Sequence, residues 1–384
     1  MKIGSLIINK YFLHLTEKCN LKCPHCFNQA MPVELDLKTI SNLLSRMDKY
    51  GISEICLSGG EPLLHSSFED VIRIIPSNVK ISIFTNGVLL NDKHIYAKLE
   101  NINNLQYIQV SLDGLETNTQ IRGVGYDTIL QAIKKIKQLG YRCIVSTSCT
   151  KNNLKELGDL YKELVKLNVE MWRLSIPFPF AGKMLDYMDM SFDAIMYGFS
   201  EVIEMKMRNQ YKTNVFISNI VSTEHLNSIR GGNINLMKLS QHFSDIHPCV
   251  NCAKSINIKA NYNVAKCDIM SDFILYNIQN DTNGLDNIFD EKAEASKKLL
   301  YFSNIKLNKI CLDCKYLIVC HGGCPGNSYR WLGDMTIPDP ISCNLMYRSK
   351  ELFSLLGYNS FILNDRNNPY YNDRTTTDIY QRKL

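Results

Sequence analysis

The sequence predicts an α/β fold in which repeated βα units surround a parallel sheet. From about residue 10 to residue 219, short runs of β-branched and aromatic residues alternate with longer amphipathic stretches, as in βα units. Short polar motifs follow the ends of successive runs. Because functional sites of parallel sheets lie at the carboxyl ends of the strands, we expect these motifs to meet in one site.

Six strands and their helices follow in order from this pattern. The predicted strands are Tyr11–Thr16, Glu54–Leu57, Ile81–Phe84, Tyr107–Leu112, Arg142–Ser146 and Trp172–Ile176. The predicted helices are a segment with apolar Ile40, Leu43, Leu44 and Met47, then Ser67–Ile75, Asp92–Leu99, Tyr126–Leu139 and Leu154–Leu167. Gly140 stands where a C-terminal helix cap is useful. A further helix to Met207 and a strand at Asn214–Ile217 are expected next.

The overall composition is that of a globular protein. Of 384 residues, 45% are hydrophobic and 21% are charged, which argues against disorder and coiled coils. No apolar run reaches the roughly 18 residues of a membrane-spanning helix. Asn9 and Lys10 interrupt the aliphatic start, so no signal peptide is predicted. The 43 basic and 38 acidic residues form no dense basic block. We therefore expect a cytoplasmic protein that binds neither membranes nor nucleic acid.

Fourteen cysteines are the most unusual feature of the composition. In a reducing compartment, cysteines bind metals or take part in catalysis more often than they form disulfides. One group, on the loop after the first strand, has the order Cys19-x3-Cys23-x2-Cys26. A later group has the order Cys311-x2-Cys314-x5-Cys320-x3-Cys324 and then Cys343, and Cys249, Cys252 and Cys267 lie between the groups. Three others, Cys56, Cys143 and Cys149, are expected to be small buried residues of the core.

The first cysteine group leaves two interpretations open. Three thiolates can hold three irons of a 4Fe-4S cluster and leave the fourth iron to an exogenous ligand. Alternatively, His25 would complete a four-ligand zinc site with the three cysteines. The motifs at the neighbouring strand ends have no role in a zinc site, so we favour the cluster.

This cysteine spacing resembles the signature of the radical S-adenosylmethionine superfamily. The resemblance implies a partial (β/α)6 TIM-like barrel and S-adenosylmethionine chelated to the open iron by its amino and carboxylate groups. It further implies that an electron from the cluster cleaves the sulfonium, and that the resulting 5′-deoxyadenosyl radical abstracts a substrate hydrogen atom. One departure is His25, because the superfamily usually has an aromatic residue before the third cysteine.

The motif after the second strand resembles a cofactor-binding turn of the same superfamily. Gly59 and Gly60 permit close backbone approach to a ligand. Glu61, before the rigid Pro62, resembles the carboxylate that meets the methionine ammonium. An ordinary turn is the structural alternative for this motif.

Four residues after the next strands resemble further cofactor contacts. Thr85 and Asn86 resemble the ribose contacts of the superfamily. Ser111 and Arg122 resemble the pair that holds the methionine carboxylate, a task to which a bidentate guanidinium is suited. A solvated surface arginine is the alternative for Arg122.

The later cysteines resemble the SPASM subgroup of the superfamily, a cysteine-rich iron-sulfur domain with two auxiliary 4Fe-4S clusters. By this resemblance, one cluster is held by Cys311, Cys314, Cys320 and Cys343, and the other by Cys249, Cys252, Cys267 and Cys324. Tyr262 stands where the subgroup has glycine, which leaves open whether Cys249 or Cys252 matches the first ligand. The alternative is a pair of four-cysteine zinc sites. With the first group, the resemblance implies three 4Fe-4S clusters.

Asp268 directly follows a cysteine of this set and is a candidate catalytic base. Members of the resembling group that oxidise peptide side chains can carry an acidic base for this step. A carboxylate beside a cluster and away from bulk water is expected to have a raised pKa and to accept a substrate proton. Capping of backbone amides is the alternative role.

The expected function is oxidative modification of a peptide by a radical enzyme, as in a ribosomal peptide maturase that forms a carbon-carbon or thioether cross-link. An anaerobic sulfatase maturase that forms formylglycine and a tetrapyrrole or small-molecule tailoring enzyme are enzymatic alternatives. A noncatalytic iron-sulfur electron carrier or sensor is the alternative of another class. Gly59, Gly60 and Glu61 argue against a carrier, which needs no ligand-binding loop beside its cluster.

The expected organisation has a radical S-adenosylmethionine barrel at residues 1–225, a SPASM domain at 226–345 and a C-terminal tail at 346–384. The expected partners are a peptide or protein substrate and a flavodoxin- or ferredoxin-type reductant. Because eighteen residues precede Cys19, we expect either a separate leader-recognition protein or unaided substrate recognition.

Overall fold

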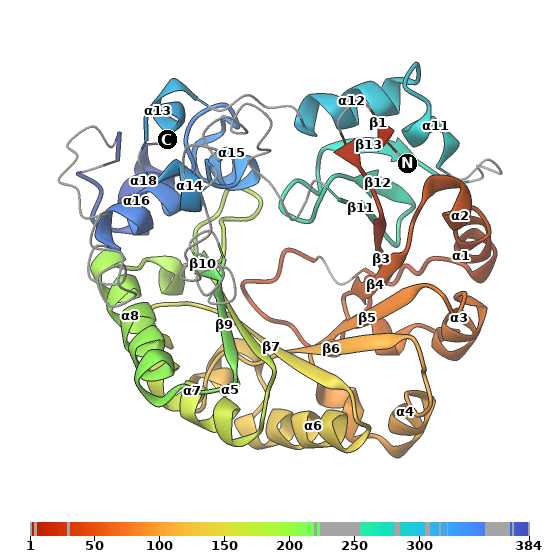
Figure 1. Ribbon diagram of the computed structural model, residues 1–384, viewed down its shortest axis with the longest axis horizontal. Coiled ribbons are helices and arrows are strands. Elements are labelled where there is room, and N and C mark those ends of the chain that lie inside the picture. Colours follow the sequence, from red (N-terminus) through yellow and green to blue (C-terminus); the bar gives the residue numbers. More distant parts are fainter. Residues whose placement is uncertain are drawn as a thin grey trace. The chain divides into compact units, whose positions relative to one another are not determined.

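The computed structural model describes residues 2–3, 6–28, 31–218, 221–222, 254–279, 285–303, 308–314, 316–320, 322–349, 369–370 and 372–382. The chain divides into two compact units. Unit 1 comprises Met1–Leu112, Asn118–Ile144 and Val250–Asn304, and unit 2 comprises Asp113–Thr117, Val145–Cys249 and Ile305–Leu384. Each unit contains parallel strands and helices (Figure 1).

The sheet of unit 1 has the strand order β6-β5-β4-β3-β11-β12-β13. Its strands are β3 (Lys10–Thr16), β4 (Glu54–Gly59), β5 (Lys80–Thr85), β6 (Leu105–Ser111), β11 (Ser255–Ile258), β12 (Asn263–Ala265) and β13 (Ile274–Asn277). Neighbours from β6 to β11 run parallel, whereas β12 is antiparallel to both of its neighbours. A separate antiparallel pair is formed by β1 (Lys2–Ile3) and β2 (Leu6–Ile7). The four predicted strands of this unit agree with β3 to β6 to within two residues.

One face of β3 to β6 forms the hydrophobic core of the unit. Leu13, Leu57, Ile83 and Ile108 stand opposite one another across the four strands, and all four are fully buried. A one-residue slip of any strand would turn its apolar side chains to the other face, so this row sets the register. The opposite face of the same strands carries partly exposed Phe12, Ser58, Phe84 and Tyr107.

The helices of unit 1 include those that the apolar periodicity predicts near residues 40–47, 67–75, 92–99 and 126–139. They are α1 (Leu37–Leu44), α2 (Met47–Tyr50), α3 (Phe68–Ile74), α4 (Lys93–Lys98), α5 (Thr117–Arg122), α6 (Tyr126–Gln138), α11 (Asp286–Phe289) and α12 (Glu294–Ser303), with 3-10 turns η1 (Pro62–Leu64) and η2 (Val88–Asn91). Asp36 caps α1 by accepting a hydrogen bond from the Thr39 N–H at 2.8 Å. Gly140 follows α6 with a φ of +78°, as the sequence predicts for a C-terminal cap.

β11 extends the parallel sheet of unit 1 beside β3, although it lies more than 200 residues further along the sequence. All four of its residues are buried, including the polar Ser255 and Asn257. Tyr262, between β11 and β12, adopts a left-handed φ of 65°, a conformation that glycine adopts at lower cost. Its hydroxyl donates to Asp36 Oδ2 at 3.0 Å.

Unit 2 has the strand order β10-β9-β8-β7. The strands are β7 (Arg142–Ser148), which begins in unit 1, β8 (Met171–Ser175), β9 (Asn214–Ile217) and β10 (Val221–Ser222). Its helices are η3 (Leu154–Glu156), α7 (Leu157–Lys166), η4 (Asp186–Met188), α8 (Phe192–Asn209), α13 (Lys309–Leu312), α14 (Leu317–Cys320), α15 (Pro325–Leu332), α16 (Pro340–Arg348) and α18 (Thr376–Gln381). Trp172 is fully buried, and its indole N–H donates to Thr147 Oγ1 at 2.8 Å. Among the described residues of the whole chain, no helix is long and apolar enough to cross a membrane.

Candidate functional site

The first cysteine group lies on the loop that leaves the carboxyl end of β3. The loop is tied at its base, where the Thr16 hydroxyl and the Glu17 N–H both donate to the Val33 carbonyl, at 3.1 and 2.9 Å. Cys19 and Cys23 are half-buried and Cys26 is exposed. Burial raises the pKa of the Cys19 thiol. These three side chains are therefore held close to the sheet edge while remaining open to a ligand.

Each of the three sulfurs accepts a hydrogen bond from a nearby N–H group. The Leu21 N–H donates to Cys19 Sγ and the Asn28 N–H to Cys26 Sγ, both at 3.4 Å. Cys23 Sγ lies 4.0 Å from Nη1 of Arg122, the last residue of α5. Donors of this kind stabilise thiolates and tune the potential of an iron-sulfur cluster. Each of the three thiols of the loop thus has an N–H donor within reach of its sulfur.

Gly59 and Gly60 bring the end of β4 into contact with the start of the cysteine loop. Gly59 has a φ of +134°, and a Cβ there would lie 2.2 Å from the Thr16 carbonyl oxygen. A Cβ at Gly60 would lie 2.4 Å from the Lys18 carbonyl oxygen, to which the Glu61 N–H donates at 2.8 Å. The close approach that both glycines permit in this structure is therefore to the backbone of residues 16–18.

Glu61 is a fully buried carboxylate at the N-terminus of η1, whose first residue is Pro62. Its Oε1 accepts hydrogen bonds from Thr85 Oγ1 at 2.8 Å and from the Leu63 N–H at 3.3 Å. Its Oε2 accepts one from the Asn86 N–H at 2.8 Å. Burial raises the pKa of the Glu61 carboxyl to about 7, although these hydrogen bonds work in the opposite direction. A cationic ligand would favour the charged form of this group.

Asn86 links the buried carboxylate to the cysteine loop. Besides its backbone bond to Glu61, its Nδ2 donates to Asn20 Oδ1 at 2.8 Å and lies 3.8 Å from Cys19 Sγ. The ends of β3, β4 and β5 thus meet, as the strand-end motifs predict. Ser111 is the last residue of β6 and is half-buried.

Asp268 lies in a polar cluster that the sequence reasoning did not identify. Its Oδ1 is 2.9 Å from Nε2 of His14, 2.8 Å from Nδ2 of Asn257 and 3.3 Å from Nζ of Lys259. Burial alone would raise the pKa of the Asp268 carboxyl, but the charges of His14 and Lys259 and the hydrogen bonds outweigh it. The pKa is held well below its usual range, so the expectation of a raised pKa is wrong.

The signal for this cluster was present in the sequence. His14 is an ionisable residue inside the apolar run of β3 and is 2% exposed. A buried histidine needs a polar partner. The position of that partner depends on β11 pairing with β3, which the apolar pattern of residues 255–258 does not reveal.

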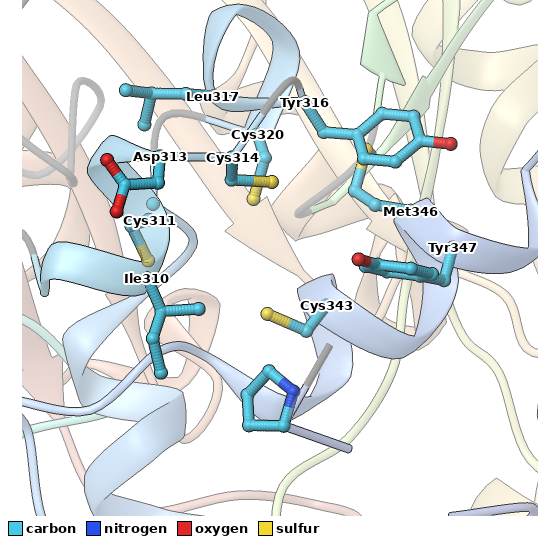
Figure 2. A pocket seen from close by; sticks show the side chains of 12 residues that line it. Ile310, Cys311, Asp313, Cys314, Tyr316, Leu317, Cys320, Cys343, Met346 and Tyr347 are labelled. Atoms are coloured by element: carbon cyan, nitrogen blue, oxygen red, sulfur yellow. The ribbon is translucent and has the colours of Figure 1, made fainter. Parts of the chain in front are cut away.

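Four of the later cysteines surround one cavity in unit 2. The cavity has a volume of about 270 Å³ and is lined by Cys311, Cys314, Cys320 and Cys343, with Tyr316, Met346 and Tyr347 beside them (Figure 2). Burial raises the pKa of the Cys311 thiol to about 11 and also raises those of the Cys320 and Cys343 thiols. Neighbouring thiols and the Asp339 carboxylate add to each rise. A cationic group in the cavity would offset this cost.

The geometry of a four-thiolate site depends on the metal group that it holds. A four-ligand zinc site needs sulfurs about 3.8 Å apart, as follows from a Zn–S bond of about 2.3 Å. Within the described part of the chain, no three His, Cys, Asp or Glu side chains are grouped so that they could hold a metal ion as they stand. Four thiols around one cavity are the donor set of a 4Fe-4S cluster.

The remaining predicted ligands are only partly described. Cys249 and Cys252 lie outside the described residues. Cys267 is a half-buried residue of unit 1, and Cys324 is a half-buried residue of unit 2, at the N-terminus of α15. The other three cysteines, Cys56, Cys143 and Cys149, are fully buried core residues, as expected.

Comparison with known proteins adds a family match to this geometry. Residues 13–164 match the model of the Radical SAM superfamily. The sporulation killing factor maturation protein SkfB of Bacillus subtilis (strain 168) is 26% identical over 222 residues, which are 56% of this chain and 52% of that protein. The chain spans about half the length of the curated relatives that it matches.

Two solved structures resemble most of the chain. SuiB of Streptococcus suis bound to precursor peptide SuiA has a TM-score of 0.65 at 16% identity, covering 87% of this chain and 75% of that one. Native anSMEcpe with bound AdoMet and Kp18Cys peptide has a TM-score of 0.68 at 16% identity, covering 92% and 99%. This likeness confirms the predicted fold class, a mixed α/β fold with the parallel sheet of a partial barrel and a C-terminal cysteine-rich region.

Proposed function

Because this chain belongs to the radical S-adenosylmethionine superfamily, we propose that it is an enzyme that cleaves S-adenosylmethionine reductively and modifies a peptide. The observation that carries the proposal is the position of Asn86, which contacts both the buried Glu61 carboxylate and Cys19 Sγ. A carboxylate suited to an ammonium group and a thiol suited to iron are thus joined by one residue. An electron carrier would need no such pairing.

In this proposal Cys19, Cys23 and Cys26 hold a 4Fe-4S cluster with one open iron. The bound cluster supplies the electron that cleaves the sulfonium of S-adenosylmethionine. Glu61 accepts the ammonium group, which compensates for the burial of its own charge. The Arg122 guanidinium, already beside Cys23, is close enough to the loop to orient the methionine carboxylate.

The remaining strand-end residues support these contacts. Thr85 donates to Glu61 and fixes its orientation, and Gly59, Gly60 and Pro62 hold the turn against the cysteine loop. We assign Thr85 and Asn86 to the ribose and Ser111 to the carboxylate side of the cofactor. A carboxylate held by one hydroxyl and two backbone N–H groups keeps its position when the ligand leaves.

We further propose that Cys311, Cys314, Cys320 and Cys343 hold an auxiliary 4Fe-4S cluster in the 270 Å³ cavity. A second auxiliary cluster is assigned to Cys249, Cys252, Cys267 and Cys324. Clusters held at these two sites would supply electron acceptors for an oxidative reaction. The barrel is assigned to residues 1–225, the auxiliary-cluster domain to 226–345 and the tail to 346–384.

The proposed substrate is a ribosomal peptide that receives a carbon-carbon or thioether cross-link. The names of SkfB, a maturation protein, and of SuiB, bound to a precursor peptide, support this class. Asp268 is assigned as the base that accepts the substrate proton, and its contacts with His14 and Lys259 fix the position of the carboxylate. A separate leader-recognition protein and a flavodoxin- or ferredoxin-type reductant are the proposed partners.

Formation of 5′-deoxyadenosine tests this function. The anaerobically reconstituted chain, reduced with dithionite, is expected to convert S-adenosylmethionine to 5′-deoxyadenosine, and Cys19→Ala is expected to abolish the product. Cys56→Ala is the matched control, because Cys56 is a fully buried thiol of β4 outside the cysteine loop. A reconstituted wild-type chain without product, or equal product from Cys19→Ala, would reject the proposal.

A further inference from the structure

The C-terminal segment (residues 369–370 and 372–382) supplies part of the wall of the cysteine cavity in unit 2. Pro369 lines the 270 Å³ cavity together with its four cysteines. The next residue, Tyr370, is buried, and its hydroxyl donates to the Pro338 carbonyl at 2.9 Å, two residues before α16 begins. Because α16 contains Cys343, the end of the chain is attached next to an element that forms the cavity.

A buried threonine anchors this segment to the rest of unit 2. Thr376, the first residue of α18, is fully buried. Its hydroxyl donates to the Met188 carbonyl at 2.6 Å and accepts from the Met190 N–H at 2.9 Å, and its own N–H donates to the Met190 carbonyl at 3.0 Å. A capping box of Thr375 and Asp378 starts α18 at the same point. Three hydrogen bonds at one buried residue thus fix the start of α18 to residues 188–190.

Two arginines add to this attachment. Arg348, the last residue of α16, donates through Nη2 to the Asp373 carbonyl at 2.7 Å and through Nη1 to Asn344 Oδ1 at 2.7 Å. Arg382 Nη2 lies 2.7 Å from Asp373 Oδ1, within the segment itself. Because Arg348 and Cys343 belong to the same helix, the first of these bonds ties the segment to an element of the cavity wall.

Apolar side chains complete the wall of the cavity. Leu317, Met346 and Pro369 line it beside the cysteines. An apolar shell of this kind controls the access of solvent to a metal site. A segment at the surface opens by local unfolding, and the free energy of opening determines how often a reagent enters. The hydrogen bonds of Thr376 and Tyr370 therefore determine how often this wall opens.

We propose that the C-terminal segment closes one side of the cysteine cavity, and that Thr376 keeps it closed against water, oxygen and small reagents. The protection of a cluster by this segment rests on the proposed function, because it requires that the four cavity cysteines bind iron and sulfide. A cluster in the cavity loses iron, and its thiols react, each time the segment detaches. The segment is then a part of the auxiliary site.

The test measures how fast the cavity thiols react in the full-length chain, anaerobically reconstituted with iron and sulfide. The protein is incubated with a ferrous chelator and iodoacetamide, and mass spectrometry of its peptides gives the alkylation rate at each cysteine. Thr376→Val keeps the shape of the side chain but leaves the Met188 carbonyl and the Met190 N–H without the hydroxyl. Thr147→Val is the matched control, because Thr147 is also fully buried in unit 2 and its hydroxyl accepts a hydrogen bond from the Trp172 indole N–H.

Thr376→Val is expected to raise the alkylation rate at the four cavity cysteines about tenfold, as the loss of two buried hydrogen bonds implies. Exposed Cys26 is the internal reference and should react at the wild-type rate in every variant. Thr147→Val should match the wild type at all of these cysteines. Cavity rates in Thr376→Val that equal those of the wild type, or an equal rise in Thr147→Val, overturn the inference.

Two further measurements keep the outcomes separate. If Thr376→Val loses the circular dichroism of the wild type, Tyr370→Phe takes its place, since it removes only the bond to the Pro338 carbonyl. It is expected to raise the cavity rates several-fold, and unchanged rates overturn the inference. The wild-type chain without iron and sulfide is alkylated in parallel. If its cavity thiols react no faster than those of the reconstituted chain, the auxiliary-cluster assignment fails, whereas the rise in Thr376→Val still tests the segment.

Discussion

The raised pKa of Glu61 predicts how the stability of the protein without S-adenosylmethionine depends on pH. A rise from the ordinary value of 4.5 to about 7 corresponds to about 3 kcal/mol at roughly 1.4 kcal/mol for each tenfold change. Because the folded state holds the proton more tightly than the unfolded state, this stability is fully present below about pH 4.5. This contribution to the free energy of unfolding decreases as the pH rises from about 4.5 to 7. Above pH 7 it does not change further.

Glu61→Gln removes this titration and is the variant to compare. Glutamine keeps an acceptor for Thr85 and Leu63 but turns an NH₂ group toward the Asn86 N–H, at a cost that does not depend on pH. The free energy of unfolding of the wild type minus that of the variant is therefore expected to fall by about 3 kcal/mol between pH 4.5 and 8.

The assay is urea denaturation of the proteins without clusters and without S-adenosylmethionine at a series of pH values, followed by far-ultraviolet circular dichroism. Glu100→Gln removes an exposed carboxylate of unit 1 and corrects for the general loss of one negative charge. A wild-type minus Glu61→Gln difference that stays constant from pH 4.5 to 8, or that rises, would refute the reasoning.

Three further substitutions test other parts of the site. Gly59→Ala places a Cβ 2.2 Å from a backbone oxygen, so this variant is expected to bind much less iron than Gly140→Ala. Gly140 is the control because it also has a positive φ but has open space around its Cβ position. Equal iron contents of the two variants would contradict this prediction. Asp268→Asn leaves its cationic partners without a carboxylate and is expected to cost about 3 kcal/mol in urea denaturation. It should also abolish peptide modification while 5′-deoxyadenosine still forms, and unchanged turnover of the peptide would remove the base assignment. Asn86→Ala loses the N–H group 3.8 Å from Cys19 Sγ and is expected to lower the potential of the first cluster in a redox titration; a potential equal to that of the wild type would contradict this.

Much of the fold could be predicted because local patterns and tertiary packing agree along β3 to β6. The apolar residues of these strands occur in runs that end at polar motifs, and the same residues form the buried row from Leu13 to Ile108. The convergence of Cys19, Glu61 and Asn86 follows from the rule that parallel strands end at one edge.

The parts that sequence reasoning missed depend on contacts between distant segments. Ser255 and Asn257 are polar, and their burial in β11 becomes evident only once that strand is paired with β3. The low pKa of Asp268 has the same origin, since His14 is 254 residues away in the sequence. Asp339 precedes Pro340, a common helix start, but its bond to the Cys324 N–H requires the folded chain.

The central claim is that the thiols of Cys19, Cys23 and Cys26 leave one iron open to S-adenosylmethionine. Electron-nuclear double resonance of the reduced protein, with S-adenosylmethionine isotopically labelled at its amino nitrogen, measures this directly. The account predicts a hyperfine coupling between that nitrogen and the cluster, absent in Cys23→Ala. A reduced cluster that shows no such coupling, or a protein that holds zinc in place of iron and sulfide, would contradict it.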